Sequence, residues 1–329
     1  MNAPPNFSSL FLALLALAGG LTMLVLGGDL LVAAAKKLAR RWGMSSLLIG
    51  LTVVAFGTST PELFVALVAT WQNHPDIMAG NVVGSNIANI GLILGLSALL
   101  APLTVRLPSI AKELYIILAA TLLVWLITWQ GFFGRPAGLV FVAVLIAYTF
   151  LSYRQARRRK RAIDQVLLPG GEAAPIAVGQ PAAALLPIAA QLSGALLLLA
   201  GGSHFFIAGA ADVARHLGIS ELVIGLTLAA VGTSLPELAS SLAAIRRREG
   251  NLLLGNIIGS NLFNLLMVLG CSALLKPFTL SAQLFSRDLP VMFGFSAVLI
   301  PLLAVQPTIT RTHGLLLLLA YGLYLYALT

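Results

Sequence analysis

Charged side chains are scarce in this sequence. Of its 329 residues, 9% are Asp, Glu, Lys or Arg, whereas 59% are hydrophobic. Soluble domains normally carry about 25% charged residues, so this composition excludes an ordinary water-soluble globular fold. Cysteine is scarcer still, because Cys271 stands alone within an apolar stretch. A disulfide framework is therefore excluded as well.

Long apolar runs take the place of the missing charge. A helix needs about 20 apolar residues to span a bilayer, and the sequence contains ten such stretches. We therefore predict an all-α membrane protein with ten transmembrane helices. The stretches lie near residues 8–35, 45–70, 77–100, 109–130, 133–153, 183–211, 218–246, 251–275, 287–305 and 312–329.

The net charge of +9 comes from basic residues that gather on one side of the expected membrane. If the N-terminus lies outside and the loops alternate, sixteen of the 20 Lys and Arg residues fall in inner loops. This bias is the positive-inside pattern of membrane proteins, so the charge indicates topology and not nucleic-acid binding. We predict a multi-pass protein of the cell membrane, with both termini outside and the central basic loop cytoplasmic.

Two motifs occur twice, at a constant offset of 175 in the numbering. Residues 50–63 and 225–238 are identical at ten of fourteen positions and share Gly-Thr-Ser-x-Pro-Glu-Leu. Residues 80–89 recur as 255–264 and share Gly-Asn-x-x-Gly-Ser-Asn-x-x-Asn. Polar motifs that are duplicated inside apolar stretches predict a transporter built from two homologous halves.

The two halves are expected to be inverted relative to each other. Each contains five of the predicted spans, and an odd number makes the second copy enter the membrane from the opposite side. We predict a first five-helix repeat over residues 1–153 and a second, inverted five-helix repeat over 182–329. The polar, Ala- and Pro-containing segment 154–181 is expected to be a flexible cytoplasmic linker.

The first motif places a proline and a carboxylate inside an apolar stretch. Pro61 has no N–H and its ring clashes with the carbonyl of Gly57, so it should break the helix and free nearby carbonyls. Glu62 follows Thr58 by four residues and Ser59 by three, so these side chains share one helix face. A carboxylate at bilayer depth is costly and marks a functional site by default. The second half repeats this set with Thr233, Ser234, Pro236 and Glu237.

The second motif adds hydroxyl and amide oxygens. Ser85 and Asn89 are four residues apart and share one helix face, and Ser260 and Asn264 match them. Such an all-oxygen set with two carboxylates suits Ca²⁺, which takes about six to eight oxygens, or Na⁺. No His/Cys cluster accompanies it, which argues against zinc or copper. Two alternatives stay open: protonated, purely structural glutamates, and asparagines that only join helices.

These paired motifs resemble the alpha repeats of the cation/calcium antiporter superfamily, and the chain is similar to its prokaryotic-type sodium/calcium exchangers. The resemblance implies the inverted five-plus-five architecture. It also implies that Ca²⁺ is coordinated by Glu62, Glu237 and the carbonyls of Thr58 and Thr233. The Na⁺ sites that it implies beside the glutamates use Ala55, Ser59, Ser85, Ala230, Ser234 and Ser260.

The resemblance further implies that Asn89 and Asn264 complete the centre of the site. Some family members carry aspartate at the position of Asn264. That departure leaves the centre less acidic, and it argues against potassium co-transport, which is typical of a branch that requires the aspartate. The proton-coupled branch usually shows Gly-Asn-x-x-Glu in place of Gly-Thr-Ser-x-Pro-Glu.

The function that the sequence predicts is exchange of Na⁺ for Ca²⁺ by alternating access. The ions are cargo, so no cofactor is expected, and membrane lipid is the expected surrounding, with no nucleic acid and no obligate protein partner. A proton/cation exchanger of the same fold and a cation channel remain alternatives. An enzyme is the weakest alternative, because the motifs contain no water-activating metal cluster and no nucleophile–base pair.

The predicted orientation can be tested at Gln180, in the central loop. A cysteine placed there in a Cys271→Ser background should react with a membrane-impermeant thiol reagent only after the cells are permeabilised, because the positive-inside pattern places this loop in the cytoplasm. Labelling of intact cells would reverse the predicted topology.

Overall fold

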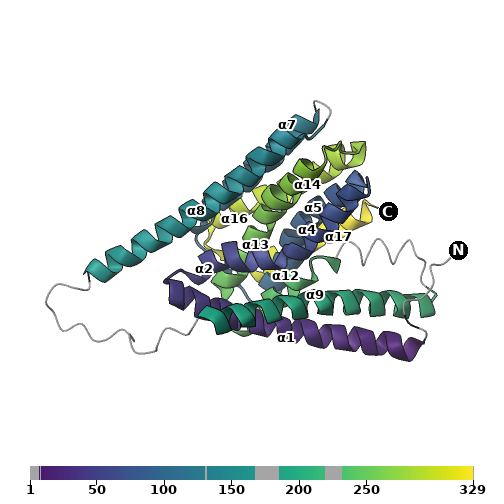
Figure 1. Ribbon diagram of the computed structural model, residues 1–329, viewed down its shortest axis with the longest axis horizontal. Helices are drawn as coiled ribbons and strands as arrows, with labels where there is room; N and C mark the ends of the chain where they lie inside the picture. Colours follow the sequence, from purple (N-terminus) through teal and green to yellow (C-terminus); the bar gives the residue numbers. More distant parts are fainter. Residues whose placement is uncertain (1–6, 8, 130–131, 167–184, 219–231, 329) are drawn as a thin grey trace.

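The computed structural model describes residues 7, 9–129, 132–166, 185–218 and 232–328. The protein is mostly helical (Figure 1). The elements of the first half are α1 (Leu10–Trp42), α2 (Ser46–Ile49), the π-helix η1 (Gly50–Val54), α3 (Ala55–Thr58), α4 (Thr60–Trp71), α5 (Pro75–Ala88), the π-helix η2 (Asn89–Leu94), α6 (Gly95–Leu100), β1 (Leu103–Thr104), the 3₁₀ helix η3 (Leu107–Ser109), α7 (Ala111–Trp129) and α8 (Arg135–Val166).

The second half follows nearly the same order. Its described elements are α9 (Leu185–His216), α12 (Leu235–Arg246), α13 (Gly250–Phe263), the π-helix η5 (Asn264–Leu269), α14 (Gly270–Leu275), the π-helix η6 (Leu284–Asp288), α15 (Leu289–Ala297), α16 (Leu299–Val305), β2 (Thr308–Ile309) and α17 (Arg311–Tyr326).

Within the described residues, seven helices are long and apolar enough to cross a membrane, and an eighth span exists if Ser46–Thr58 and Thr60–Trp71 form one broken helix. The predicted span at 218–246 falls partly on residues 219–231, outside the described residues. The predicted span at 312–329 corresponds to α17, which has 16 residues. The structure thus describes a multi-pass membrane protein, while the count of ten spans stays a prediction.

The central segment differs in part from the expected flexible linker. Helix α8 does not end near residue 153 but continues through the basic run to Val166. The α8 helix begins in the apolar stretch, so the basic segment extends a helix that is already nucleated, which costs less than starting a new one. The rest of the predicted linker, from residue 167 onward, lies outside the described residues.

Unusual backbone angles recur at the offset of the sequence repeat. The described residues with positive φ form two pairs that are each related by the offset of 175: Gly43 (64°) with Gly218 (77°), and Asn73 (62°) with Arg248 (56°). Gly43 and Gly218 follow the ends of α1 and α9, where a left-handed residue commonly terminates a helix. The duplication therefore extends from the motifs to the ends of the helices.

The two halves also exchange equivalent contacts. Strand β1 pairs antiparallel with β2, with Leu103 opposite Ile309. A separate antiparallel bridge joins Phe133 to Phe278. By the offset of the repeat, Phe278 is the equivalent of Leu103, and Phe133 is the equivalent of Thr308 in β2. Corresponding antiparallel pairings are therefore made twice with the halves exchanged, one residue apart in register by this offset.

Helix α13 lies at the centre of the molecule, and the best 18-residue window of Gly250–Leu275 is entirely buried (Figure 1). Its closest neighbour is η1. A Cβ atom added at Gly255 would lie 2.3 Å from the carbonyl oxygen of Leu47, and one added at Gly50 would lie 2.5 Å from that of Leu252. Glycine at these two positions lets the two backbones approach each other directly, as small residues do in membrane helix packing.

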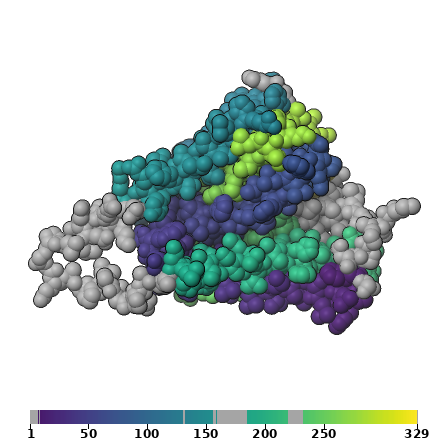
Figure 2. Space-filling view, viewed as in Figure 1, coloured from purple at the N-terminus to yellow at the C-terminus, as the bar shows by residue number. Residues whose placement is uncertain are grey.

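Helices α1 and α9 pack side by side and form a layer along one side of the molecule. The space-filling view shows this layer beneath the segments that carry the motifs, with α7 and α8 on the opposite side (Figure 2). Gly20 of α1 sits against the α9 backbone, where an added Cβ would lie 2.4 Å from the amide nitrogen of Phe206. The adjacent Gly19 is exposed and has no described atom within 4 Å of an added Cβ.

This pair of glycines provides a matched test of the α1–α9 contact. Gly20→Ala should destabilise the protein by about 1–3 kcal/mol, the usual cost of overpacking. Gly19→Ala should be neutral or stabilising by up to about 1 kcal/mol, because alanine favours the helix and meets no neighbour. Thermal unfolding of the purified protein in detergent measures both. Equal melting temperatures for the two variants would contradict the described packing.

Candidate ion-binding site

In both Gly-Thr-Ser-x-Pro-Glu segments a helix begins directly after the serine. Ser59 separates α3 from α4 with φ −81° and ψ 2°, and the two parts are bent by 42°. Ser234 precedes α12 with nearly the same angles, φ −89° and ψ 5°. The proline falls in the first turn of the following helix, where its missing N–H costs nothing. The expected break is confirmed in the first half, and the residues before the second motif's Gly232 lie outside the described residues. Glu62 and Glu237 both lie in the first turn of the helix that follows the serine, α4 and α12.

The two glutamates are completely enclosed. Glu62 is 1% exposed and Glu237 is 0% exposed. Neither carboxylate oxygen of Glu62 has a partner among the described residues, and the same holds for Oε2 of Glu237. The other oxygen of Glu237 accepts a hydrogen bond from Ser260 at 3.4 Å. Buried polar groups are normally paired, so three open carboxylate oxygens in one protein require an explanation.

The carboxylates come from different halves. Glu237 is linked to the first half through Ser260, whose hydroxyl donates to Oε1 of Glu237 at 3.4 Å and lies 3.3 Å from Oγ1 of Thr58. Further buried oxygens of the two motif pairs have no partner among the described residues. They are Oγ of Ser59 and Ser234 and Oδ1 of Asn86, Asn89 and Asn264.

The hydroxyl of Thr58, in the first half, contacts side chains of α13 in the second half. It donates to Oδ1 of Asn256 at 3.2 Å and lies 3.3 Å from Oγ of Ser260. The amide of Asn256 is in turn fixed, since its Nδ2 donates to Oγ of Ser240 at 3.0 Å. Thr58 and Ser260, two predicted ligands, are therefore brought together, with their side chains already engaged in a network that spans both halves.

The same network exists with the halves exchanged. Thr233 donates from Oγ1 to Oδ1 of Asn81 at 3.1 Å and lies 3.3 Å from Oγ of Ser85. Asn81 also donates from Nδ2 to the carbonyl of Glu62 at 3.2 Å. The predicted residues Thr233 and Ser85 are thus in contact. Two equivalent hydroxyl–amide clusters flank the pair of glutamates.

The sequence-based ligand set omitted Asn81 and Asn256, which hold the two threonines. Both occupy the second position of the Gly-Asn-x-x-Gly-Ser-Asn motif and recur at the offset of 175. Ranking by repetition would have included them. They were omitted because helix spacing alone pairs Ser85 with Asn89 on one face, and it gives no information about contacts with the other half.

The remaining predicted ligands fall in different places. Asn89 and Asn264 are the first residues of η2 and η5, and they are 1% and 0% exposed. Local π-helices are frequent at functional sites. Ala55 is buried, and its carbonyl accepts from the backbone N–H of Ser59 at 2.9 Å. Ala230 lies outside the described residues.

The chemistry of this cluster suits a hard cation. Carboxylate, hydroxyl, amide and carbonyl oxygens are the ligands that Ca²⁺ takes in flexible geometry. Within the described residues, no group of three or more His, Cys, Asp or Glu side chains could hold a metal ion. A cation here would be coordinated by two carboxylates and by neutral oxygens. The negative charge around it would be smaller than in a site with four carboxylates.

A cavity of about 510 Å³ leads to one of the two clusters. Polar residues stand at both of its ends. It reaches Asn81, Ser85 and Thr233 on the inner side and is lined by Asp76, Asp288 and Tyr324 toward the ends of α5, η6 and α17. The cavity thus extends to the half of the site that α5 provides, with polar side chains at intervals along a mostly apolar lining.

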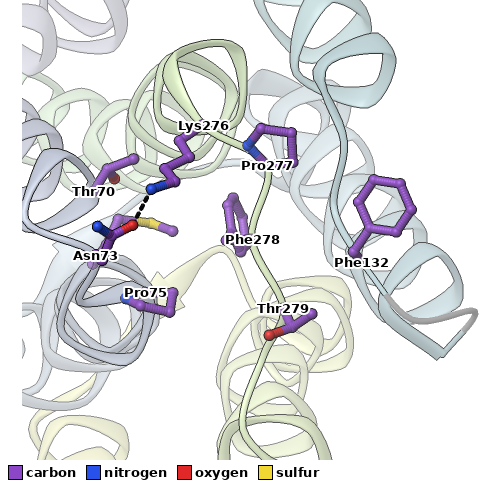
Figure 3. A pocket seen from close by; sticks show the side chains of 9 residues that line it. Thr70, Asn73, Pro75, Phe132, Lys276, Pro277, Phe278 and Thr279 are labelled. Carbon is purple, nitrogen blue, oxygen red and sulfur yellow. Dashed lines mark hydrogen bonds between the residues drawn. The ribbon is translucent and has the colours of Figure 1, made fainter.

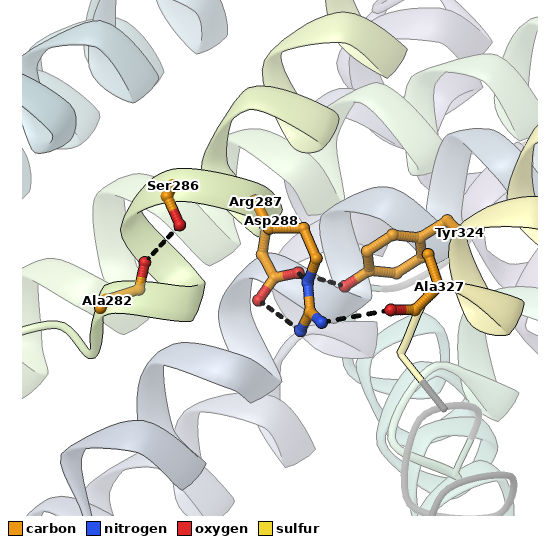
Figure 4. A network of polar contacts seen from close by, with 6 residues as sticks. All are labelled: Ala282, Ser286, Arg287, Asp288, Tyr324 and Ala327. Atoms are coloured by element: carbon orange, nitrogen blue, oxygen red, sulfur yellow. Dashed lines mark hydrogen bonds and ion pairs between the residues drawn. The ribbon is translucent and has the colours of Figure 1, made fainter.

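The rim of this cavity carries a network of its own (Figure 4). The carboxylate of Asp288 accepts from Nε of Arg287 at 2.8 Å and from Oη of Tyr324 at 3.3 Å. The other half contains a comparable pair, in which Tyr148 donates from Oη to Oε1 of Glu113 at 2.9 Å. Each half therefore joins an acid at the start of one helix to a tyrosine on another.

A second cavity, of about 770 Å³, lies beside Glu113. Its lining includes Leu47, Leu51, Arg106 and Lys112, and none of the proposed ion ligands. The two halves are thus equivalent in sequence but not in access. One cluster is reached by a cavity, whereas the other is separated from its cavity by packed residues.

A third cavity, of about 360 Å³, lies away from the glutamates (Figure 3). Met78 and Phe278 line it, and the ammonium of Lys276 donates to Oδ1 of Asn73 at its edge. An apolar lining next to a lysine is unsuited to a cation. This hollow is therefore not part of the candidate site.

Comparison with known proteins gives consistent results over the whole chain. Residues 12–154 and 188–329 match the family model described as sodium/calcium exchanger protein. The sodium/calcium exchanger MaX1 of Methanosarcina acetivorans is 33% identical, over 94% of this chain and 96% of that protein. The inner membrane protein YrbG of Escherichia coli is 36% identical, over 88% of each chain.

A solved structure of the sodium-calcium exchanger NCX_Mj superposes with a TM-score of 0.80 and 31% identity, over 98% of this chain and 100% of that chain. The similarity therefore includes both motif pairs and the helices around them. Because one family model matches both halves and these relatives align along most of their length, this chain belongs to the sodium/calcium exchanger family, which is a family of membrane ion exchangers.

Proposed function

We propose that the protein exchanges Na⁺ for Ca²⁺ across the membrane by alternating access at the site between its two halves. The observation that carries this proposal is the pair of buried glutamates with three unpartnered carboxylate oxygens. Two ionised carboxylates in a low-dielectric interior need compensating positive charge. One Ca²⁺ ion provides it, and so do Na⁺ ions bound at overlapping positions.

Competition between these two ways of balancing the charge couples the ions. Glu62, Glu237 and the carbonyls of Thr58 and Thr233 are the proposed Ca²⁺ ligands. Asn89 and Asn264 complete the centre. Na⁺ would use the neutral oxygens beside the carboxylates, provided by Ala55, Ser59, Ser85, Ala230, Ser234 and Ser260. Because each ion needs the same two carboxylates, binding of one ion displaces the other.

Alternating access follows from two inverted halves of five helices each, residues 1–153 and 182–329. The exchanged contacts of Leu103 with Ile309 and Phe133 with Phe278 support this arrangement. The unequal cavities support it further, since the site is reached from the side of Asp288 and closed on the side of Glu113. If the two halves exchanged their surroundings, the site would open on the side of Glu113 and close on the side of Asp288.

The orientation in the membrane follows from charge. The basic loops, including the central one, lie in the cytoplasm and both termini lie outside. The open cavity then faces outward, because it lies near the C-terminal end of α17. This arrangement favours an antiporter over a channel: only one of the two cavities reaches ligand residues, whereas a channel needs a path that is continuous from both sides.

The choice of Na⁺ over H⁺ rests on the neutral oxygens. A proton needs only a carboxylate, whereas a sodium ion needs a coordination shell. Ser59 and Ser234 have buried hydroxyls with no described partner beside the glutamates. Unpaired hydroxyls cost about 1–3 kcal/mol each when buried, and proton exchange would not require them. Sodium coupling gives these two hydroxyls a function, whereas the equally unpartnered hydroxyls of Ser97 and Ser272 lie outside the two motifs.

The two carboxylates provide the first test. Glu62→Gln and Glu237→Gln should each reduce Ca²⁺ uptake into proteoliposomes by about 100-fold or more, because one uncompensated charge in a buried site is worth about 3–5 kcal/mol. Both variants should still fold, since glutamine preserves the volume of the side chain.

Glu113→Gln is the matched control, because it neutralises a carboxylate that is only 7% exposed but lies outside the site. Its Ca²⁺ flux should stay close to that of the unchanged protein. Near-normal Ca²⁺ flux in either Glu62→Gln or Glu237→Gln would contradict the proposed site.

The second test concerns the counter-ion. Ca²⁺ flux should be driven by a Na⁺ gradient, without any requirement for K⁺, because Asn264 lacks the charge that could recruit K⁺. Ser59→Ala and Ser234→Ala should raise the Na⁺ concentration needed for half-maximal exchange more than they weaken Ca²⁺ binding. Radioactive Ca²⁺ flux under imposed Na⁺, K⁺ or H⁺ gradients measures each of these quantities.

Ser97→Ala and Ser272→Ala are the controls. These serines are 0% exposed, lack described partners and form an equivalent pair in α6 and α14, but neither is a predicted ligand. Their removal should leave the Na⁺ dependence unchanged. Full-rate Ca²⁺ movement driven by a proton gradient in sodium-free vesicles would replace the sodium assignment with proton coupling.

A further inference from the structure

Four buried asparagines lie where the helices of the second motif meet at the centre of the molecule. Asn86 and Asn89 belong to the first half, and Asn261 and Asn264 are their equivalents in the second. All four are 0–1% exposed. Asn89 and Asn264 are proposed ligands, whereas Asn86 and Asn261 have no role in the exchange described so far.

The hydrogen bonds of these amides do not follow the symmetry of the sequence. Asn261 reaches across to the first half twice. Its Nδ2 donates to the backbone carbonyl of Asn86 at 3.3 Å, and its Oδ1 accepts from Nδ2 of Asn89 at 2.9 Å. Asn261 therefore fixes the orientation of the Asn89 amide, which leaves only Oδ1 of Asn89 open.

Asn86 behaves differently, although it occupies the same motif position. Its Nδ2 donates to the carbonyl of Val82 in its own helix at 2.7 Å, and its Oδ1 has no partner among the described residues. Both amide atoms of Asn264 are likewise without a described partner. The bonds that Asn261 makes to the first half are thus not made by Asn86 to the second half.

This difference coincides with the difference in access. The cavity reaches Asn81 and Ser85 on α5, the helix whose Asn86 is disengaged. On α13 the amide of Asn261 is engaged, and the residues equivalent to Asn81 and Ser85 do not line the cavity beside Glu113. The engaged amide lies in the half that is closed, and the disengaged amide lies in the half that is open.

We propose that Asn261 and Asn86 are positioning residues that act in turn. Asn261 holds Asn89 in the state described here, and Asn86 holds Asn264 when the cavity opens on the opposite side. The proposal rests on alternating access as the proposed function. The net contribution of one hydrogen bond shifts an equilibrium between two conformational states by about two- to tenfold. Asn261 therefore favours the state described here, and Asn86 favours the state that is open on the opposite side.

The test uses a cysteine at Leu284, which is 7% exposed and lines the open cavity. In a Leu284→Cys, Cys271→Ser background, the rate of reaction with a methanethiosulfonate reagent reports the opening of that cavity. Asn261→Ala should lower this rate by about two- to tenfold. Adding Asn86→Ala to Asn261→Ala should restore it, because both states then lose the same support.

If Asn86 and Asn261 only stabilise the fold, the double variant should be less stable than Asn261→Ala. Its labelling rate should then be no closer to that of the unchanged protein. A labelling rate that is unchanged by Asn261→Ala, or that is not restored in the double variant, would overturn the proposal. Asn261→Ser, which keeps a hydroxyl acceptor for Asn89, should fall between Asn261→Ala and the unchanged protein, and it gives a second reading if the alanine variant folds poorly.

The labelling is carried out on purified protein in the absence of Ca²⁺ and Na⁺. It therefore does not depend on which ions are exchanged. Retained Ca²⁺ flux in Glu62→Gln would overturn the proposed ion site while leaving the labelling result interpretable. Failure of the labelling test with loss of flux in Glu62→Gln would overturn only the positioning role.

Discussion

Two carboxylates enclosed between helices, with most of their oxygens unpartnered, are the constraint on which the rest of the structure depends. Leaving such groups without compensation is expensive in a membrane interior. Glu62 and Glu237 lie in the first turn of helices that begin directly after a serine, where backbone N–H groups have no partner within the helix. The motifs add neutral oxygens without adding charge, and in the proposed exchange that balance would favour release of the ion.

The internal repeat provides these neutral oxygens. One motif pair, used twice, builds two hydroxyl–amide clusters, because Thr58 contacts the α13 cluster while Thr233 contacts the α5 cluster. Each half thus completes the site of the other. The close approach of Gly50 and Gly255 brings the two halves into direct backbone contact, and the paired segments at Leu103 and Phe278 repeat the exchange at the periphery.

Much of this could be predicted from the sequence, because the repeated motifs carry local information. The helix break at Pro61 follows from a missing N–H. The single helix face expected for Thr58, Ser59 and Glu62 assumes a continuous helix, and the break at Ser59 interrupts it. Contacts between the halves do not follow from either rule. The role of Asn256 depends on what packs nearby, which neither spacing nor composition determines. The basic run is helical to Val166 because it extends a helix that begins in the apolar stretch.

The difference between the two halves is the feature that sequence could least reveal. Asn86 and Asn261 occupy identical motif positions, so any rule based on residue type or spacing assigns them the same surroundings. Their different hydrogen bonds accompany a difference in access, since the cavity reaches α5, which carries Asn86, and the cavity beside Glu113 does not reach the equivalent residues of α13. If the protein works by the proposed alternating access, a symmetric sequence has to provide two states of nearly equal energy. A free-energy gap of a few kcal/mol or less leaves both populated enough for a bound ion to shift the balance.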